Sequence, residues 1–159
     1  MFGPDGYLPS RVLVSPDQLY EGFVAAFPQS TTRANLFQAW LFHRVEVAEL
    51  VRVRMQWIGG SFATSRVDPP DIDVVTFIEG PEFETLSPGR IRLVERLFEG
   101  PKTRDERGVD AYVVAYYPET HPARFGYARA RGDWDDHFSR LKDDHDRSRG
   151  YLEVRDDPS

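Results

Sequence analysis

Cysteine is absent from the 159 residues, which excludes disulfide bonds, thiolate zinc sites and cysteine nucleophiles. No apolar run approaches the ~20 residues that a membrane-spanning helix needs. The first residues, Met1 to Tyr7, also lack the basic start and apolar core of a secretory signal. We therefore expect a cytoplasmic protein with no membrane partner.

Lysine is scarce, since only Lys102 and Lys142 occur and the positive charge is almost entirely arginine. Asp and Glu number 26 against 20 Lys and Arg, which gives a net charge of −6. Strong nonspecific nucleic-acid binding is not favoured, because it depends on Lys and Arg that neutralise phosphates. The 40% of hydrophobic residues is typical of a globular chain, and we expect one domain over residues 1–159.

Several residue patterns in the chain mark where helices begin and end. Ser15-Pro16-Asp17-Gln18 has the N-cap, first-turn proline and capping-box glutamine of a helix start. A longer helix is predicted to begin near residues 30–32, and Ser87-Pro88 opens another that ends at Gly100. The buried stripe expected on the longer helix is Leu36, Phe37, Trp40, Leu41, Val45, Ala48, Val51 and Met55. A last helix is marked by Trp134, Phe138 and Leu141.

Four segments are predicted to be strands: residues 56–58, 72–78, 109–117 and 151–154. A short helix over residues 62–66 would close the turn after the first of them. The predicted fold class is α/β (α+β), a small mixed sheet with helices packed against it.

The most informative stretch runs from Trp57 to Val75. Gly59-Gly60-Ser61 follows an apolar pair, and glycines there let backbone N–H groups approach an anion closely. Asp71 and Asp73 open an apolar strand, and because alternate strand residues share a face, their carboxylates lie ~7 Å apart on one side. Such a pair favours a cation between them, for which Mg²⁺ or Mn²⁺ is the natural candidate.

This stretch resembles the signature of the nucleotidyltransferase superfamily, the polymerase-beta-like fold: an apolar residue, Gly, then Gly or Ser, a spacer of roughly ten residues, and Asp-apolar-Asp-apolar. Gly60-Ser61 with nine intervening residues fits it, and Gly59-Gly60 with ten fits it too. More narrowly, residues 7–154 look like a small bacterial family of nucleotidyltransferase-like domains of unestablished function. The supporting segments are residues 57–62, 69–75, 108–112 and 149–154.

The resemblance implies a metal-dependent nucleotidyltransferase that uses an NTP. Ser61 and its neighbouring N–H groups would hold the phosphates, and Asp71 and Asp73 would bind the metal. Asp110 matches the third aspartate of the pattern; it is also an isolated acid at the start of an apolar strand, and would bind a second metal and help to deprotonate the attacking hydroxyl. Arg66 and Lys102 could reach the phosphates.

Plainer interpretations stay open at this point. Gly-Gly-Ser could be an ordinary turn, Asp110 could cap a strand beside Gly108, and Arg66 and Lys102 could be surface charges. The acceptor could be a protein, an RNA or a small molecule. The alternative function is a noncatalytic nucleotide-binding or protein-interaction module, such as one member of a toxin–antitoxin or phage-defence pair.

Overall fold

A five-stranded sheet organises the computed structural model, which describes residues 1–141, 144 and 148–156. The strands stand in the order β1-β5-β2-β3-β4, and β2 runs antiparallel to both of its neighbours while the two outer pairs are parallel. Their bounds are Val12–Val14 (β1), Val53–Gly59 (β2), Asp73–Glu79 (β3), Asp110–Tyr116 (β4) and Leu152–Val154 (β5).

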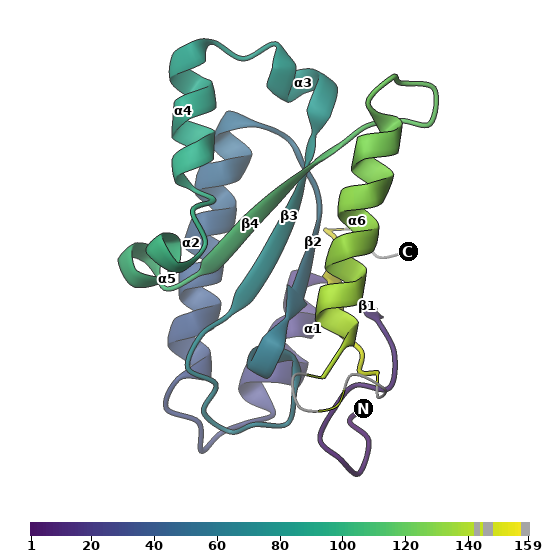
Figure 1. Ribbon diagram of the computed structural model, residues 1–159. Coiled ribbons are helices and arrows are strands. Elements are labelled where there is room, and N and C mark those ends of the chain that lie inside the picture. The colour runs from purple at the N-terminus through teal and green to yellow at the C-terminus, as the bar shows by residue number, and fades with distance from the viewer. Residues whose placement is uncertain (142–143, 145–147, 157–159) are drawn as a thin grey trace.

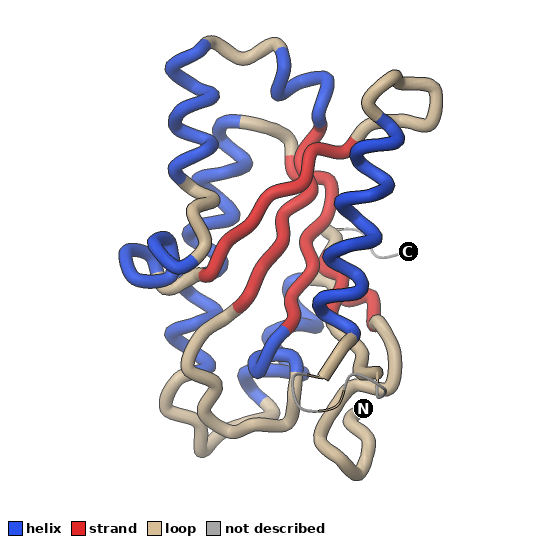
Figure 2. Tube along the Cα trace, viewed as in Figure 1, coloured by secondary structure: helices blue, strands red, loops and turns tan. Residues whose placement is uncertain are grey.

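Helices cover both faces of this sheet (Figures 1 and 2). The long helix α6 crosses the near face in Figure 1, and α2 lies behind the strands. The helices are α1 (Pro16–Tyr20), continued by a π-helical turn η1 (Glu21–Ala25), α2 (Arg33–Leu50), a 3-10 turn η2 (Gly60–Ala63), α3 (Gly80–Glu84), α4 (Pro88–Arg96), α5 (Pro101–Arg107) and α6 (Arg124–Ser139). Within the described residues, none of them is long and apolar enough to traverse a bilayer.

Strand alternation divides the core between the two faces of the sheet. Val74 packs with Trp40 of α2 on one face, whereas Val75 and Phe77 pack with Phe138 of α6 on the other. The face toward α2 also carries a buried polar pair, because Trp40 Nε1 donates to Gln56 Oε1 at 3.1 Å. Each helix therefore fixes one side of the strands that carry the motif.

The structure confirms the strands and the helix starts. All four predicted strands lie in the one sheet, with bounds that differ from the prediction by at most three residues. The Ser15 hydroxyl accepts from the Gln18 N–H, and Gln18 Oε1 accepts from the Ser15 N–H, which completes the capping box. Ser87 likewise caps α4.

The buried stripe predicted for α2 is wrong at Val45 and Ala48, whereas Val51 is buried as expected. Val45 is 56% exposed and Ala48 is exposed, whereas His43 and Val47 are buried. The helix is turned because polar residues on its buried face, which an apolar pattern does not mark, find hydrogen-bond partners in the core. Met55 belongs to β2, since the chain is already extended at Val51.

Three helix ends also differ from the prediction. The segment after Gly59 forms η2 instead of a helix over residues 62–66, because the chain becomes extended at Thr64. α4 ends at Arg96, and Gly100, at φ +56°, precedes α5 instead of closing α4. Leu141 lies beyond α6, which ends at Ser139.

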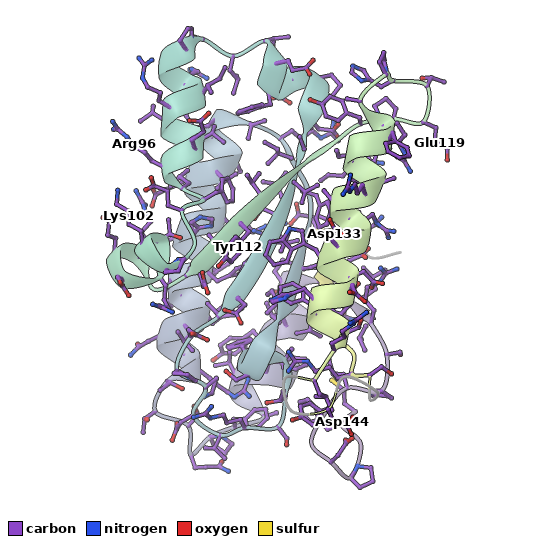
Figure 3. All side chains as sticks on the ribbon, viewed as in Figure 1. Arg96, Lys102, Tyr112, Glu119, Asp133 and Asp144 are labelled. Carbon is purple, nitrogen blue, oxygen red and sulfur yellow. The ribbon has the colours of Figure 1, made fainter. Side chains whose placement is uncertain are left out.

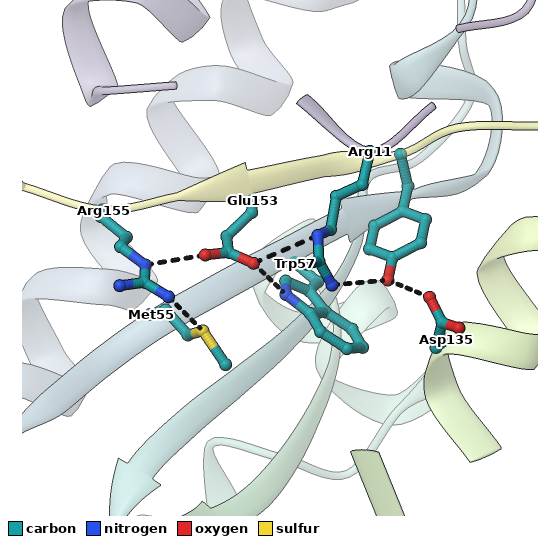
Figure 4. A network of polar contacts seen from close by, with 7 residues as sticks. Arg11, Met55, Trp57, Asp135, Glu153 and Arg155 are labelled. Atoms are coloured by element: carbon teal, nitrogen blue, oxygen red, sulfur yellow. Dashed lines mark hydrogen bonds and ion pairs between the residues drawn. The ribbon is translucent and has the colours of Figure 1, made fainter. Parts of the chain in front are cut away.

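A buried polar network ties β5 to β2 and α6 (Figure 4). Glu153 of β5 accepts hydrogen bonds from Trp57 Nε1 at 3.1 Å and from Arg155 Nε at 2.7 Å, and pairs with Arg11 at 3.4 Å. The hydroxyl of Tyr151 donates to Asp135 of α6 at 2.5 Å. These contacts fix the end of α6 and the segment before β5 relative to β2.

Candidate active site

Two of the three sequence-predicted carboxylates lie side by side. β3 and β4 are parallel with Asp73 directly opposite Asp110, and the Asp110 N–H donates to the carbonyl of Ile72 at 3.0 Å. Paired residues of a ladder project to the same face. The Val75 side chain, two residues after Asp73, packs toward α6, so both carboxylates are on the α6 face. Asp71 is half-buried and stands two residues ahead of β3.

The glycine turn closes against this pair. Gly59 is opposite Asp73 on the other side, in the antiparallel β2–β3 register. Gly60 has φ +66°, and a Cβ added there would collide with Asp73 Oδ2. A Cβ at Gly59 would collide with the ring of Phe138 from α6. The backbone therefore approaches the Asp73 carboxylate as closely as only glycine allows, with Ser61 next in the turn.

The Asp110 carboxylate is asymmetric in its surroundings. Its Oδ1 is buried and has no hydrogen-bond partner. The Tyr112 hydroxyl is close by. The side chain of Tyr112 extends from β4 toward α6 (Figure 3), where the centre of its ring is 4.8 Å from the centre of the Trp134 ring. Burial raises the pKa of Tyr112 to about 12, helped by a hydrogen bond to Asp110 and by the charges of Asp110 and Asp73. Tyr112 is therefore a neutral donor beside the acidic pair.

An orphaned buried carboxylate oxygen is costly, and a cation would satisfy it. Within the described residues, no three His, Cys, Asp or Glu side chains are grouped so as to hold a metal ion by themselves. Mg²⁺ commonly takes only one or two carboxylates and completes its octahedron with substrate phosphates and water. The pair of Asp73 and Asp110 fits that role, with a phosphate as the companion ligand.

Arg33, which the sequence did not mark as functional, holds the segment after the glycine turn through hydrogen bonds. It is fully buried, and its guanidinium donates only to main-chain oxygens: those of Phe23 (3.0 Å), Phe62 (2.9 Å), Thr64 (2.7 Å) and Arg66 (2.6 Å from Nη2). Burial lowers the pKa of Arg33 to about 10, partly opposed by the charge of Asp68. These bonds hold the end of η2 and the extended segment from Thr64 to Arg66 that replaces the predicted helix.

Arg66 and Lys102 are the two basic residues that the sequence suggested for phosphate binding, and the structure directs both side chains outward from the protein. The side chain of Arg66 is exposed, and its carbonyl is the part held by Arg33. Lys102 points outward on the far side from α6 (Figure 3) and pairs with Glu99 at 3.2 Å. Neither observation adds to the evidence for phosphate binding by these residues.

Arg149 is a basic residue that the sequence did not single out as functional. Its Nε donates to the carbonyl of Phe138 at 3.2 Å, and Phe138 is the residue that packs against Gly59. Burial lowers the pKa of Arg149, whereas the charges of Tyr7 and Asp73 oppose that shift. The sequence signal was only its place in the closing 149–154 segment, 76 residues after Asp73.

An open groove lies elsewhere, between the C-terminal half of α2 and the ends of β2 and β3. Val45, Ala48, Arg54 and Glu79 are among its lining residues. Arg54 pairs with Glu79 at 3.1 Å. The exposed Val45 and Ala48 of α2 therefore face this groove. Its lining includes none of the residues of the glycine turn or the acidic pair.

The fold and this site together define a mixed α/β protein with an acidic pair and a glycine turn on one face of an open sheet. The profile of a family of unknown function, DUF6932, matches residues 1–155. The chain therefore belongs to that family. No curated protein and no solved structure matches it.

Proposed function

We propose that this protein is a metal-dependent nucleotidyltransferase with a polymerase-beta-like palm, which transfers a nucleotide from an NTP to a hydroxyl of a protein, an RNA or a small molecule. The observation that carries the proposal is the register of β3 and β4, which sets Asp73 beside Asp110 while Asp110 Oδ1 stays buried without a partner. The turn at Gly60 supplies the close backbone approach that a phosphate requires.

Each residue has a role in this proposal. Asp73 and Asp110 would hold Mg²⁺ or Mn²⁺ together with the triphosphate, while Asp71, two residues ahead of β3, adds negative charge near this pair. The N–H groups of Gly60 and Ser61 bind phosphate oxygens. The metal, when bound, neutralises charge on the triphosphate and on the departing pyrophosphate. NTPs and Mg²⁺ are both cytoplasmic, which is the compartment that we assign.

The chemistry is a displacement at the α-phosphorus. The acceptor oxygen forms a bond to that phosphorus, the bond to the bridging oxygen of pyrophosphate breaks, and Asp110 accepts the hydroxyl proton. Positioning and charge neutralisation supply most of the rate in such reactions. Tyr112, protonated at neutral pH, keeps one side of Asp110 occupied and orients the carboxylate.

A panel of NTPs with Mg²⁺ or Mn²⁺, assayed for pyrophosphate release and for self-labelling, tests the proposal. We expect release with at least one NTP, and Asp110→Asn, which keeps one oxygen but loses the charge, should lower turnover by orders of magnitude and weaken NTP binding by a much smaller factor. If Asp110 only caps a strand, the variant will keep full activity and melt at a lower temperature.

Binding of an NTP without release or labelling would instead favour the noncatalytic nucleotide-binding module. An absence of nucleotide binding with either metal would contradict both functions.

A further inference from the structure

Arg149 reaches the glycine turn from the side of α6. Its N–H donates to the carbonyl of Ser139 at 2.8 Å and its Nε to that of Phe138, so the residue is attached to the end of α6 at two points. The Phe138 ring in turn fills the space that a side chain at Gly59 would need. One packed residue thus separates Arg149 from the turn.

A second set of contacts places Arg149 at the same turn independently. Its guanidinium carbon is 5.9 Å from the centre of the Tyr7 ring. Tyr7 forms an antiparallel bridge with Thr64, the residue that follows η2. The guanidinium therefore lies between the end of α6 and the N-terminal segment, both of which border residues 59–64.

The backbone next to Arg149 is tightly constrained. The Gly150 N–H donates to the carbonyl of Leu8 at 2.6 Å, and a Cβ at Gly150 would collide with the backbone of Ser10. The main chain is therefore held at Arg149 and Gly150, and the contacts with the Phe138 carbonyl and the Tyr7 ring place the guanidinium beside the turn. Arg149 is half-buried, and the charge of Asp73 opposes the lowering of its pKa that burial causes.

The guanidinium of Arg149 can interact with two different groups, the Asp73 carboxylate before ligands bind and a phosphate afterwards. Before ligands bind, it lies near enough to Asp73 to offset part of that negative charge. Once a metal holds Asp73, the guanidinium is repelled by the metal and attracted by phosphate, for which its planar fork is well suited.

Resting on the proposed function, we infer that Arg149 binds the triphosphate of the NTP and, without nucleotide, acts as a counter-ion to Asp73 that competes with the metal. Metal and nucleotide consequently promote each other's binding. Removing Arg149 lowers the affinity for the nucleotide without lowering the affinity for the metal alone, which a purely structural role would not do.

Calorimetry with the α,β-methylene analogue of an NTP that the protein binds, in Mg²⁺, and with Mn²⁺ alone, tests this inference. For Arg149→Gln we expect analogue affinity to fall at least tenfold, while Mn²⁺ alone binds as tightly as before or more tightly. Arg149→Lys keeps the charge without the fork and should lose less. Arg129→Gln, the same change at an exposed position of α6, should alter neither affinity.

Each other outcome overturns the inference in a recognisable way. If the wild type binds the analogue and Arg149→Gln binds it equally well, the inference fails and the proposed function stands. If both affinities fall together with the melting temperature, Arg149 is a structural residue. If the wild type binds no nucleotide, the proposed function and the inference fail together.

Discussion

Gly60→Ala separates the role of the turn in ligand binding from its role in folding. At φ +66° an alanine is in the left-handed region, which costs about 1–2 kcal/mol. Its methyl group would also collide with the Asp73 carboxylate, so either the turn or Asp73 must move. We expect the free energy of unfolding to fall by about 1–3 kcal/mol and the affinity for Mg²⁺·NTP to fall more than tenfold.

Gly108→Ala is the matched control. Gly108 has φ +81° at the end of α5, so alanine suffers a similar backbone strain there. Its methyl group would meet the Cβ of Ala39 at 3.1 Å, away from Asp73. Thermal melting should show comparable losses for the two variants, each about 2–4 °C per kcal/mol.

Calorimetric titration of Mg²⁺·NTP then discriminates between them, because Gly108→Ala should keep most of its affinity. Our reasoning about the turn is refuted if Gly60→Ala binds the nucleotide as tightly as the wild type, or if both variants lose affinity in proportion to their stability.

Two further predictions concern buried polar side chains on α2. Arg33→Lys keeps the charge but leaves several buried carbonyls without a hydrogen-bond donor. We therefore expect the free energy of unfolding in urea to fall by roughly 3 kcal/mol and NTP binding to weaken. Unchanged stability would contradict this role of Arg33. His43 Nε2 donates to the carbonyl of Leu97 at 2.6 Å, and burial lowers the pKa of His43. Because the unfolded chain therefore takes up the proton first, stability should fall as pH drops below about 6.5, by up to about 1 kcal/mol per pH unit. His43→Gln should flatten that slope between pH 7.5 and 5.5, and an equal slope in the variant would exclude His43 as its cause.

The parts of the fold that local chemistry determines were predictable from the sequence. Ser15 and Ser87 cap helices because their hydroxyls accept from N–H groups three residues later, which needs no tertiary information. The β-branched run that begins after Asp73 forms a strand for a similarly local reason. The place of Asp110 beside Asp73 was anticipated from the family resemblance, and composition alone would not have given it.

The parts that depend on long-range packing were not predictable. Arg33 is buried although an isolated arginine favours water, because four carbonyls that are distant in the sequence gather around it, those of Phe23, Phe62, Thr64 and Arg66. α2 is rotated for the same reason, which leaves Val45 exposed. Arg149 borders the glycine turn because β5 pairs with β2 and returns the C-terminal segment to the sheet.

The central claim is that the acidic pair beside the glycine turn binds an NTP through a divalent metal. Titration of NTPs into the wild type and into the double variant Asp73→Ala/Asp110→Ala, each with Mg²⁺ and with EDTA, tests it most directly. We predict binding by the wild type that requires Mg²⁺ and is abolished in the double variant, with the variant still folded by circular dichroism. Equal binding with EDTA, or by the double variant, would contradict the account.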